Sequence, residues 1–111
     1  MMTEEEERAI AAEFGQVVNM TAEELESWLA TDESKAVGQK SDGGESTGHE
    51  SGRKIVELLH AKKASLTEPD YAHMRKVIGY VHRHLAQRPS GDVRETRWRY
   101  SLMNWGHDPL R

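Results

Sequence analysis

The residues best suited to chemistry lie in a glycine-rich stretch, GGESTGHESGRK, at residues 43–54. Three of its four glycines, Gly44, Gly48 and Gly52, recur every four residues, and glycine lets backbone N–H groups approach a ligand without a Cβ in the way. The apolar sequence that follows is typical of a helix, and the free N–H groups at a helix start bind anions. Arg53 and Lys54 would oppose the helix dipole at that position unless an anion is bound. The pattern therefore predicts a phosphate-binding loop.

The predicted phosphate contacts from this stretch are Ser51, Gly52, Arg53 and Lys54. Ser51 is expected to cap a helix that starts directly after it, because serine is a favoured N-cap residue. Residues 38–50 are expected to form the preceding loop, and loops of about 13 residues are usually functional or disordered. The alternative interpretation is a flexible loop that ends in an ordinary helix cap.

The same stretch contains fragments of catalytic and nucleotide-binding motifs, all of them incomplete. GESTG at residues 44–48 matches the hydrolase nucleophile elbow, which requires a preceding strand and a large sheet. His49 and Glu50 begin a zinc-protease motif, but Arg53 occupies the place of its second histidine. No register gives the glycine–lysine spacing of a P-loop. We predict no enzymatic activity and no cofactor; an enzyme with His49 or Glu50 beside a phosphorylated small molecule is an alternative.

The histidines do not form a metal-binding pattern, and no metal is predicted. His82 and His84 are two residues apart and would therefore face different sides of a helix. No pair of histidines has the three- or four-residue spacing that places two side chains on one helical face. The sequence has no cysteine, which excludes disulfides and thiolate ligands.

A second group of residues with binding chemistry lies in residues 68–87. Its polar positions recur at three, four, three and four residues, so they share one face of a helix. These positions are His73, Lys76, Tyr80, Arg83 and Gln87. Positive side chains in such a row can follow a phosphate backbone, and we predict contacts from Lys76 and Arg83. The alternative is an ordinary solvated helix face.

The segment ETRWRYSLMNW at residues 95–105 interleaves basic and aromatic side chains, as nucleic-acid surfaces often do. Trp98 and Trp105 share a helical face with Leu102, so we expect the tryptophans in the core. The arginines are then expected to touch a partner. They are Arg94, Arg97 and Arg99.

The elements that must position these residues are helices, because no segment alternates with period two. Apolar periodicity and capping patterns predict helices over residues 3–19, 21–29, 51–63, 67–88 and 92–106, with a short turn at 32–37. Asp92 with Glu95 is expected to start the last helix, and Leu59 is expected to face the core. The predicted fold class is all-α, with one small domain of four to five helices at residues 9–111 and a flexible acidic segment at residues 1–8.

The charge distribution favours a polyanionic partner. The net charge is −4, but residues 1–33 carry ten acids and one base, whereas residues 34–111 carry nine acids and fourteen lysines or arginines. A basic body of this kind attracts polyanions. No run approaches the roughly 18 apolar residues of a membrane span. We expect no membrane partner and a cytoplasmic protein, associated with the nucleoid if it is bacterial.

Four segments also carry a resemblance to a known family. They are VNMTAEELESWL, VGQKSDGGESTGHESGRKIVELL, DYAHMRKVIGYVHRHLAQRP and TRWRYSLMNWGHDP. From Val17 to Leu110 the chain resembles a small family of bacteria and fungi described as a domain of unknown function, some of whose members are labelled DNA-binding proteins. The resemblance implies DNA binding but no mechanism. Ser51 to Leu59, with the helix at 25–29, is also similar to SAP-type DNA-binding modules, although the connecting loop is much longer here.

The predicted function is therefore non-enzymatic binding of nucleic acid, most simply double-stranded DNA, with weak sequence preference. Neutralising about four to six phosphates would give a log–log salt slope of about −4 to −5. The alternative from another class is a protein–protein interaction module, an adaptor or a homodimer, with no role in nucleic-acid binding.

Overall fold

The computed structural model describes residues 2–37 and 47–111, and every regular element in these ranges is helical. The helices are α1 (Glu4–Val17), α2 (Ala22–Leu29), α3 (Asp32–Ala36), α4 (Thr47–His60), α5 (Glu68–Leu85) and α6 (Arg97–Asn104), with a 3-10 turn η1 at Lys63–Ser65. The predicted all-α class is confirmed. The described part has six α-helices where four to five are predicted, because the short turn at residues 32–37 is itself a helix.

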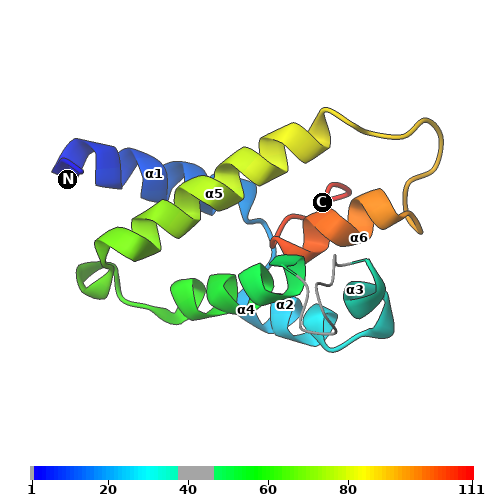
Figure 1. The fold of residues 1–111 in the computed structure, drawn as a ribbon, viewed down its shortest axis with the longest axis horizontal. Coiled ribbons are helices and arrows are strands. Elements are labelled where there is room, and N and C mark those ends of the chain that lie inside the picture. The colour runs from blue at the N-terminus through cyan, green and yellow to red at the C-terminus, as the bar shows by residue number, and fades with distance from the viewer. Residues whose placement is uncertain (1, 38–46) are drawn as a thin grey trace.

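The longest described helix, α5, runs diagonally through the upper part of the view in Figure 1 and contacts both α1 and α6. α1 packs along α5, while α2 packs against α4 on the other side of the molecule. α6 contacts α2, α3, α4 and α5 and so joins the two sides. None of the helices in the described ranges is long and apolar enough to cross a membrane.

Threonine is the N-cap residue of α1, α2, α3, α5 and α6. The Glu24 backbone N–H donates to Thr21 Oγ1 at 3.1 Å, and the Thr21 backbone N–H donates to Glu24 Oε1 at 2.8 Å. Thr3 and Glu6 make the same reciprocal pair ahead of α1. Residues 4–8 are thus helical, and the flexibility of the segment at residues 1–8 stays a prediction.

The predicted start of the last helix at Asp92 and Glu95 is wrong, because Thr96 is the N-cap of α6. The Arg99 backbone N–H donates to Thr96 Oγ1 at 3.2 Å. The Asp92 carboxylate is occupied by Arg94, whose backbone N–H donates to it at 3.0 Å. A carboxylate satisfied by its own loop is not available to cap the helix that follows.

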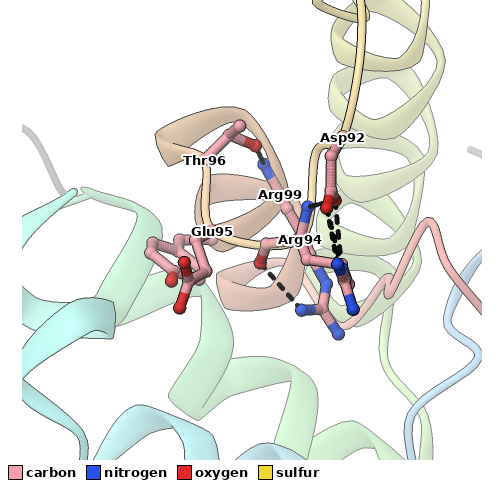
Figure 2. Close-up of a pocket in the computed structure, with 6 residues that line it drawn as sticks. Asp92, Arg94, Glu95, Thr96 and Arg99 are labelled. Atoms are coloured by element: carbon pink, nitrogen blue, oxygen red, sulfur yellow. Dashed lines mark hydrogen bonds and ion pairs between the residues drawn. The ribbon is translucent and has the colours of Figure 1, made fainter.

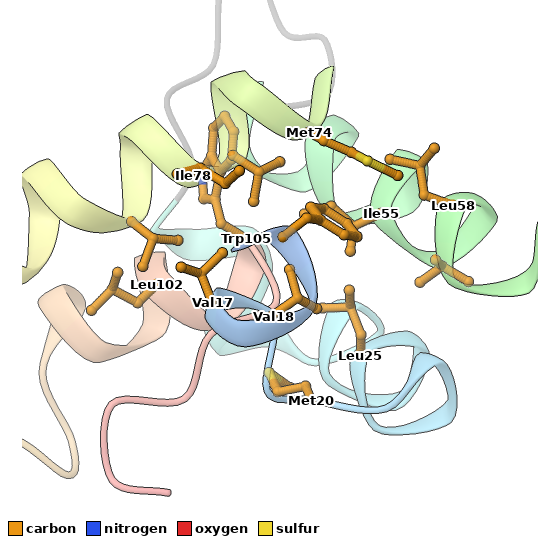
Figure 3. Close-up of a cluster of buried hydrophobic side chains, with 14 of the residues drawn as sticks. Val17, Val18, Met20, Leu25, Ile55, Leu58, Met74, Ile78, Leu102 and Trp105 are labelled. Atoms are coloured by element: carbon orange, nitrogen blue, oxygen red, sulfur yellow. The ribbon is translucent and has the colours of Figure 1, made fainter. Parts of the chain in front are cut away.

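The hydrophobic core lies between α5 and the helices α1, α2, α4 and α6 (Figure 3). Trp98 and Trp105 are 7% and 4% exposed, which confirms that the tryptophans belong to the core. Leu59 is 37% exposed, so its predicted inward position is wrong. It lies in the last turn of α4, which reaches the periphery of the molecule (Figure 1).

α4 begins earlier than the sequence predicts. Residues 47–50 belong to α4, so the loop predicted at residues 38–50 wrongly includes the first turn of this helix. Ser51 is therefore not a helix cap. Ser51 is instead the fifth residue of α4 and is only 3% exposed. The rest of the predicted loop, residues 38–46, lies outside the described residues.

The four-residue glycine spacing has a packing explanation. A Cβ on Gly52 would lie 2.6 Å from the Asn104 carbonyl oxygen and 2.7 Å from Leu29 Cδ2. A Cβ on Gly48 would lie 3.3 Å from Trp105 Nε1. Because no side chain fits at Gly52, its glycine allows α4 to approach α2 and α6 closely. Gly52 therefore has a role in helix packing, and its predicted contact with a phosphate stays a prediction.

A buried polar residue, Asn104, connects three helices at this contact. Asn104 is 1% exposed, and its Oδ1 accepts a hydrogen bond from Trp28 Nε1 at 2.7 Å and another from the Ser34 hydroxyl. Its Nδ2 donates to the Ser34 carbonyl oxygen at 3.0 Å. The side-chain amide thereby ties the end of α6 to α2 and α3.

Candidate functional site

A polar pocket of about 340 Å³ lies between α4 and α5. It is lined by Glu50, Ser51, Lys54, Pro69, His73 and Lys76. The pocket brings together predicted contact residues from two helices, Ser51 and Lys54 from α4 and Lys76 from α5. These residues are separated by more than twenty positions in the chain, so only the packing of the two helices makes them one site.

Two of the residues that line the pocket form a hydrogen-bonded pair between α4 and α5. Ser51 Oγ and His73 Nε2 are 3.0 Å apart. Burial, followed by the nearby charges of Lys76 and Lys54, lowers the pKa of His73 from its usual value. The imidazole is therefore neutral near pH 7, and the positive charge of the pocket comes from its two lysines.

The two lysines differ in their surroundings. Lys54 Nζ lies 2.8 Å from Asp70 Oδ1, and this ion pair joins α4 to the first turn of α5. The hydrogen bond from Lys54, together with one from the Thr67 backbone, lowers the pKa of Asp70 to about 2. Lys76 is exposed on α5 and faces the same pocket. Asp70 therefore offsets part of the positive charge of Lys54. The charge of Lys76 is less compensated and contributes more to the pocket.

The polar face predicted on α5 is interrupted in its middle. Tyr80 stacks on Trp105 with ring centroids 4.1 Å apart and an interplanar angle of 12°. Burial raises the pKa of Tyr80, although a hydrogen bond with Ser101 acts in the opposite direction. Tyr80 therefore belongs to the packing against α6 and not to an open row, which leaves Lys76 and Arg83 as exposed cations on this side of α5.

The arginines around α6 form a separate pocket of about 730 Å³ (Figure 2). Arg94 Nε and Nη2 donate to Asp92 Oδ2 at 3.0 and 2.7 Å. Arg99 Nε and Nη2 donate to Asp108 at 3.1 Å each, and Arg99 Nη1 donates to the Arg94 carbonyl oxygen at 2.9 Å. Since three of its donors are occupied, we assign Arg99 to holding the C-terminal segment, and its predicted phosphate contact stays a prediction.

The assignment of Arg99 makes a stability prediction. Arg99→Lys replaces a planar group that pairs with both oxygens of Asp108 by a single ammonium. We expect the free energy of unfolding to fall by about 1–2 kcal/mol, because the pair is largely shielded from solvent and its hydrogen bonds are charge-assisted. Urea unfolding followed by tryptophan fluorescence measures this change. An unchanged midpoint would show that the pair does not fix the C-terminal segment.

The remaining predicted contact residues stand apart from the α4–α5 pocket. Arg97 is exposed, and its Nη2 lies 3.5 Å from the Ala36 carbonyl oxygen at the end of α3. Arg83 is exposed on α5, and Arg53 is exposed on α4. Of the predicted contact residues, Ser51, Lys54 and Lys76 therefore line one pocket, whereas Arg53, Arg83 and Arg97 lie on the surface outside it.

Pro69 is not identified as a pocket residue from the sequence, Glu50 is named only for the alternative enzymatic function, and the pairing of His73 with Ser51 is not predicted. His73 was recognisable as a member of the polar face of α5, since it precedes Lys76 by three residues. Ser51 is a predicted contact, but its pairing with His73 carries no sequence signal, because the pairing depends on how two helices pack. Within residues 2–37 and 47–111, no group of three or more His, Cys, Asp or Glu side chains could hold a metal ion.

The fold and the pocket define a small all-helical protein with a lysine-bearing polar pocket between two helices. Residues 13–103 match the family described as "Protein of unknown function (DUF3140)", and the chain belongs to this family. The predicted resemblance to a family of unknown function is thereby confirmed. No curated protein and no solved structure matches the chain.

Proposed function

We propose that the protein binds DNA through its phosphates, with weak sequence preference and without catalysis. The observation that carries this proposal is the convergence of Lys54 and Lys76, from two different helices, on one pocket with the Ser51 hydroxyl. Lysine ammonium and serine hydroxyl groups are common donors to phosphate oxygens. Backbone contacts of this kind fix position but carry no sequence information.

Exposed cations extend the proposed contact along α5. Lys76 and Arg83 are seven residues apart, which corresponds to about 10 Å along a helix, or roughly three base-pair steps of one DNA strand. Arg97 lies on α6, which packs against α5, and adds a further exposed charge. With Arg94 and Arg99 engaged by carboxylates, about three or four phosphates are neutralised, and the expected log–log salt slope is about −3 to −4.

The family resemblance supports this proposal to a limited extent. The label carried by some family members agrees with the charge argument, but it names no binding residues. The likeness to SAP-type modules gives little support, because α3 intervenes between α2 and α4.

The test is fluorescence anisotropy with labelled random-sequence duplex DNA at two salt concentrations. We expect Lys54→Ala/Lys76→Ala to weaken binding about 10-fold or more at low salt and to reduce the salt slope by about 2, one unit for each lost phosphate contact. A matched control is Lys62→Ala/Lys63→Ala, which removes two exposed lysines outside the pocket. Thermal unfolding of both variants checks that they are folded, because Lys54 also pairs with Asp70.

Two results would contradict the proposal. One is the absence of binding by the wild-type protein at low salt. The other is an equal loss of affinity in the two double variants, which would mean that net charge alone, and not the pocket, decides binding.

A second function is favoured by a different pocket, of about 440 Å³, near α2. Its lining includes Trp28, Met20 and Met103, whose apolar surfaces suit a protein side chain. This pocket fits the alternative of a protein–protein module or homodimer. Multi-angle light scattering over a range of protein concentrations tests it, since a homodimer would show twice the chain mass.

A further inference from the structure

We propose that the pocket between α4 and α5 takes the terminal phosphomonoester of a nucleic acid strand in preference to the phosphodiesters of its interior. This inference rests on the proposed function and narrows it to strand ends. Three observations support it. Ser51 is buried and His73 is partly buried, the polar side chains of the pocket can donate hydrogen bonds to a ligand, and a terminal phosphate carries more negative charge than an internal one.

The polar groups of the pocket lie below the surface. Ser51 is 3% exposed and His73 is partly buried, whereas Lys76 is exposed. A phosphate oxygen reaches the Ser51 hydroxyl only by entering the pocket. An internal phosphate carries a sugar on two of its oxygens, while a terminal phosphate carries a sugar on one and projects from the strand. The terminal group is therefore the one that can enter a pocket of about 340 Å³.

The Ser51–His73 pair can direct a hydrogen-bond donor into the pocket. We assign the proton of the neutral imidazole to Nε2, so that His73 donates to Ser51 Oγ across the 3.0 Å contact. The Ser51 O–H is then free to donate to a ligand oxygen. A phosphate oxygen can thus accept from serine as well as from the lysine ammonium groups.

Charge favours the terminal phosphate further. A phosphomonoester carries about −1.5 to −2 at pH 7, whereas an internal phosphate carries one negative charge. Both Lys54 and Lys76 are attracted more strongly to the higher charge, although Asp70 at 2.8 Å from Lys54 offsets the charge of one lysine. Glu50 also lines the pocket and repels the phosphate. Removing the Glu50 charge should therefore strengthen the interaction.

The test compares two DNA hairpins that carry an internal fluorophore and differ only in a 5′-phosphate or a 5′-hydroxyl. For the full-length wild-type protein, we expect the phosphorylated hairpin to bind about 10-fold more tightly, as one additional charge-assisted hydrogen bond allows. We expect Lys76→Ala to lose most of this preference while keeping its thermal unfolding midpoint, because Lys76 is exposed. Ser51→Ala should also lose most of the preference and should unfold at a slightly lower temperature, because His73 loses its hydrogen bond to the buried serine. Glu50→Gln should increase the preference.

The outcomes separate this inference from the function on which it rests. Equal binding of the two hairpins overturns the preference for ends and leaves DNA binding in place. Binding of neither hairpin overturns both. Adenosine 5′-monophosphate serves as a competitor: displacement of only the phosphorylated hairpin, lost in Lys76→Ala, supports a phosphomonoester pocket. If the mononucleotide binds the protein while neither hairpin does, the pocket serves a small molecule and the nucleic-acid proposal fails.

Discussion

Replacing Gly52 by alanine is expected to lower the free energy of unfolding by about 2 kcal/mol, in spite of the higher helix propensity of alanine. The added Cβ would lie 2.6 Å from the Asn104 carbonyl oxygen and 2.7 Å from Leu29 Cδ2. The leucine side chain can rotate away, but the carbonyl oxygen belongs to the backbone at the end of α6. α4 must therefore move away from α6, which disturbs the buried contacts between them.

Gly15 provides the matched control, because it also lies within a helix. A Cβ on Gly15 meets nothing within 4 Å, and the residue is exposed on α1. Gly15→Ala should therefore raise the free energy of unfolding by about 0.5–1 kcal/mol. Urea denaturation of the two variants measures both changes. If Gly52→Ala were as stable as Gly15→Ala, the close approach of α4 to α6 would be refuted as the reason for the glycine.

The expected loss in Gly52→Ala also has a functional consequence. Ser51 and Lys54 lie on either side of Gly52 in α4 and line the pocket with residues of α5. A shift of α4 changes the distance from Ser51 Oγ to His73 Nε2, which is 3.0 Å in the native arrangement. DNA affinity should therefore fall together with stability in this variant, whereas Gly15→Ala should leave affinity unchanged.

Most of the fold follows from local sequence patterns. The threonine at the start of α2 and the apolar period of α5 predict their helices correctly, because both are decided by residues three or four positions apart. The start of α4 does not follow from such patterns. GESTGHESG is a poor helix former by propensity, and residues 47–50 become helical because Gly48 and Gly52 pack against the end of α6.

The candidate site was predictable only in part, for a related reason. Lysine and serine residues near a glycine-rich segment indicate phosphate chemistry, and three of the predicted residues do line one pocket. Whether an arginine is available is a tertiary property. Arg99 precedes its partner Asp108 by nine residues, and nothing in that spacing signals an ion pair. The charge pattern thus identified the basic segments, but the packing decided which cations remain exposed.

Asn104→Ala is expected to have the largest effect on stability among these variants, a loss of about 3–4 kcal/mol in the free energy of unfolding. The substitution leaves the Trp28 Nε1–H, the Ser34 hydroxyl and the Ser34 carbonyl oxygen without their partner in a buried site. Each unsatisfied buried group costs about 1–3 kcal/mol, although the costs are not additive. Few small domains tolerate such a loss, since their total stability is about 5–15 kcal/mol.

Ser34→Ala is the comparison that separates the network from simple cavity formation. It removes one donor to Asn104 Oδ1 while the bond from Trp28 and the bond to the residue 34 carbonyl oxygen stay in place. We expect a loss of about 1 kcal/mol, the usual net contribution of one hydrogen bond. If Asn104→Ala cost no more than Ser34→Ala in urea unfolding, the amide would not be the connection between α2, α3 and α6. A much larger loss of unfolding free energy in Asn104→Ala than in Ser34→Ala would indicate that the Asn104 amide fixes the end of α6. This is the part of α6 against which Gly48 and Gly52 of α4 pack.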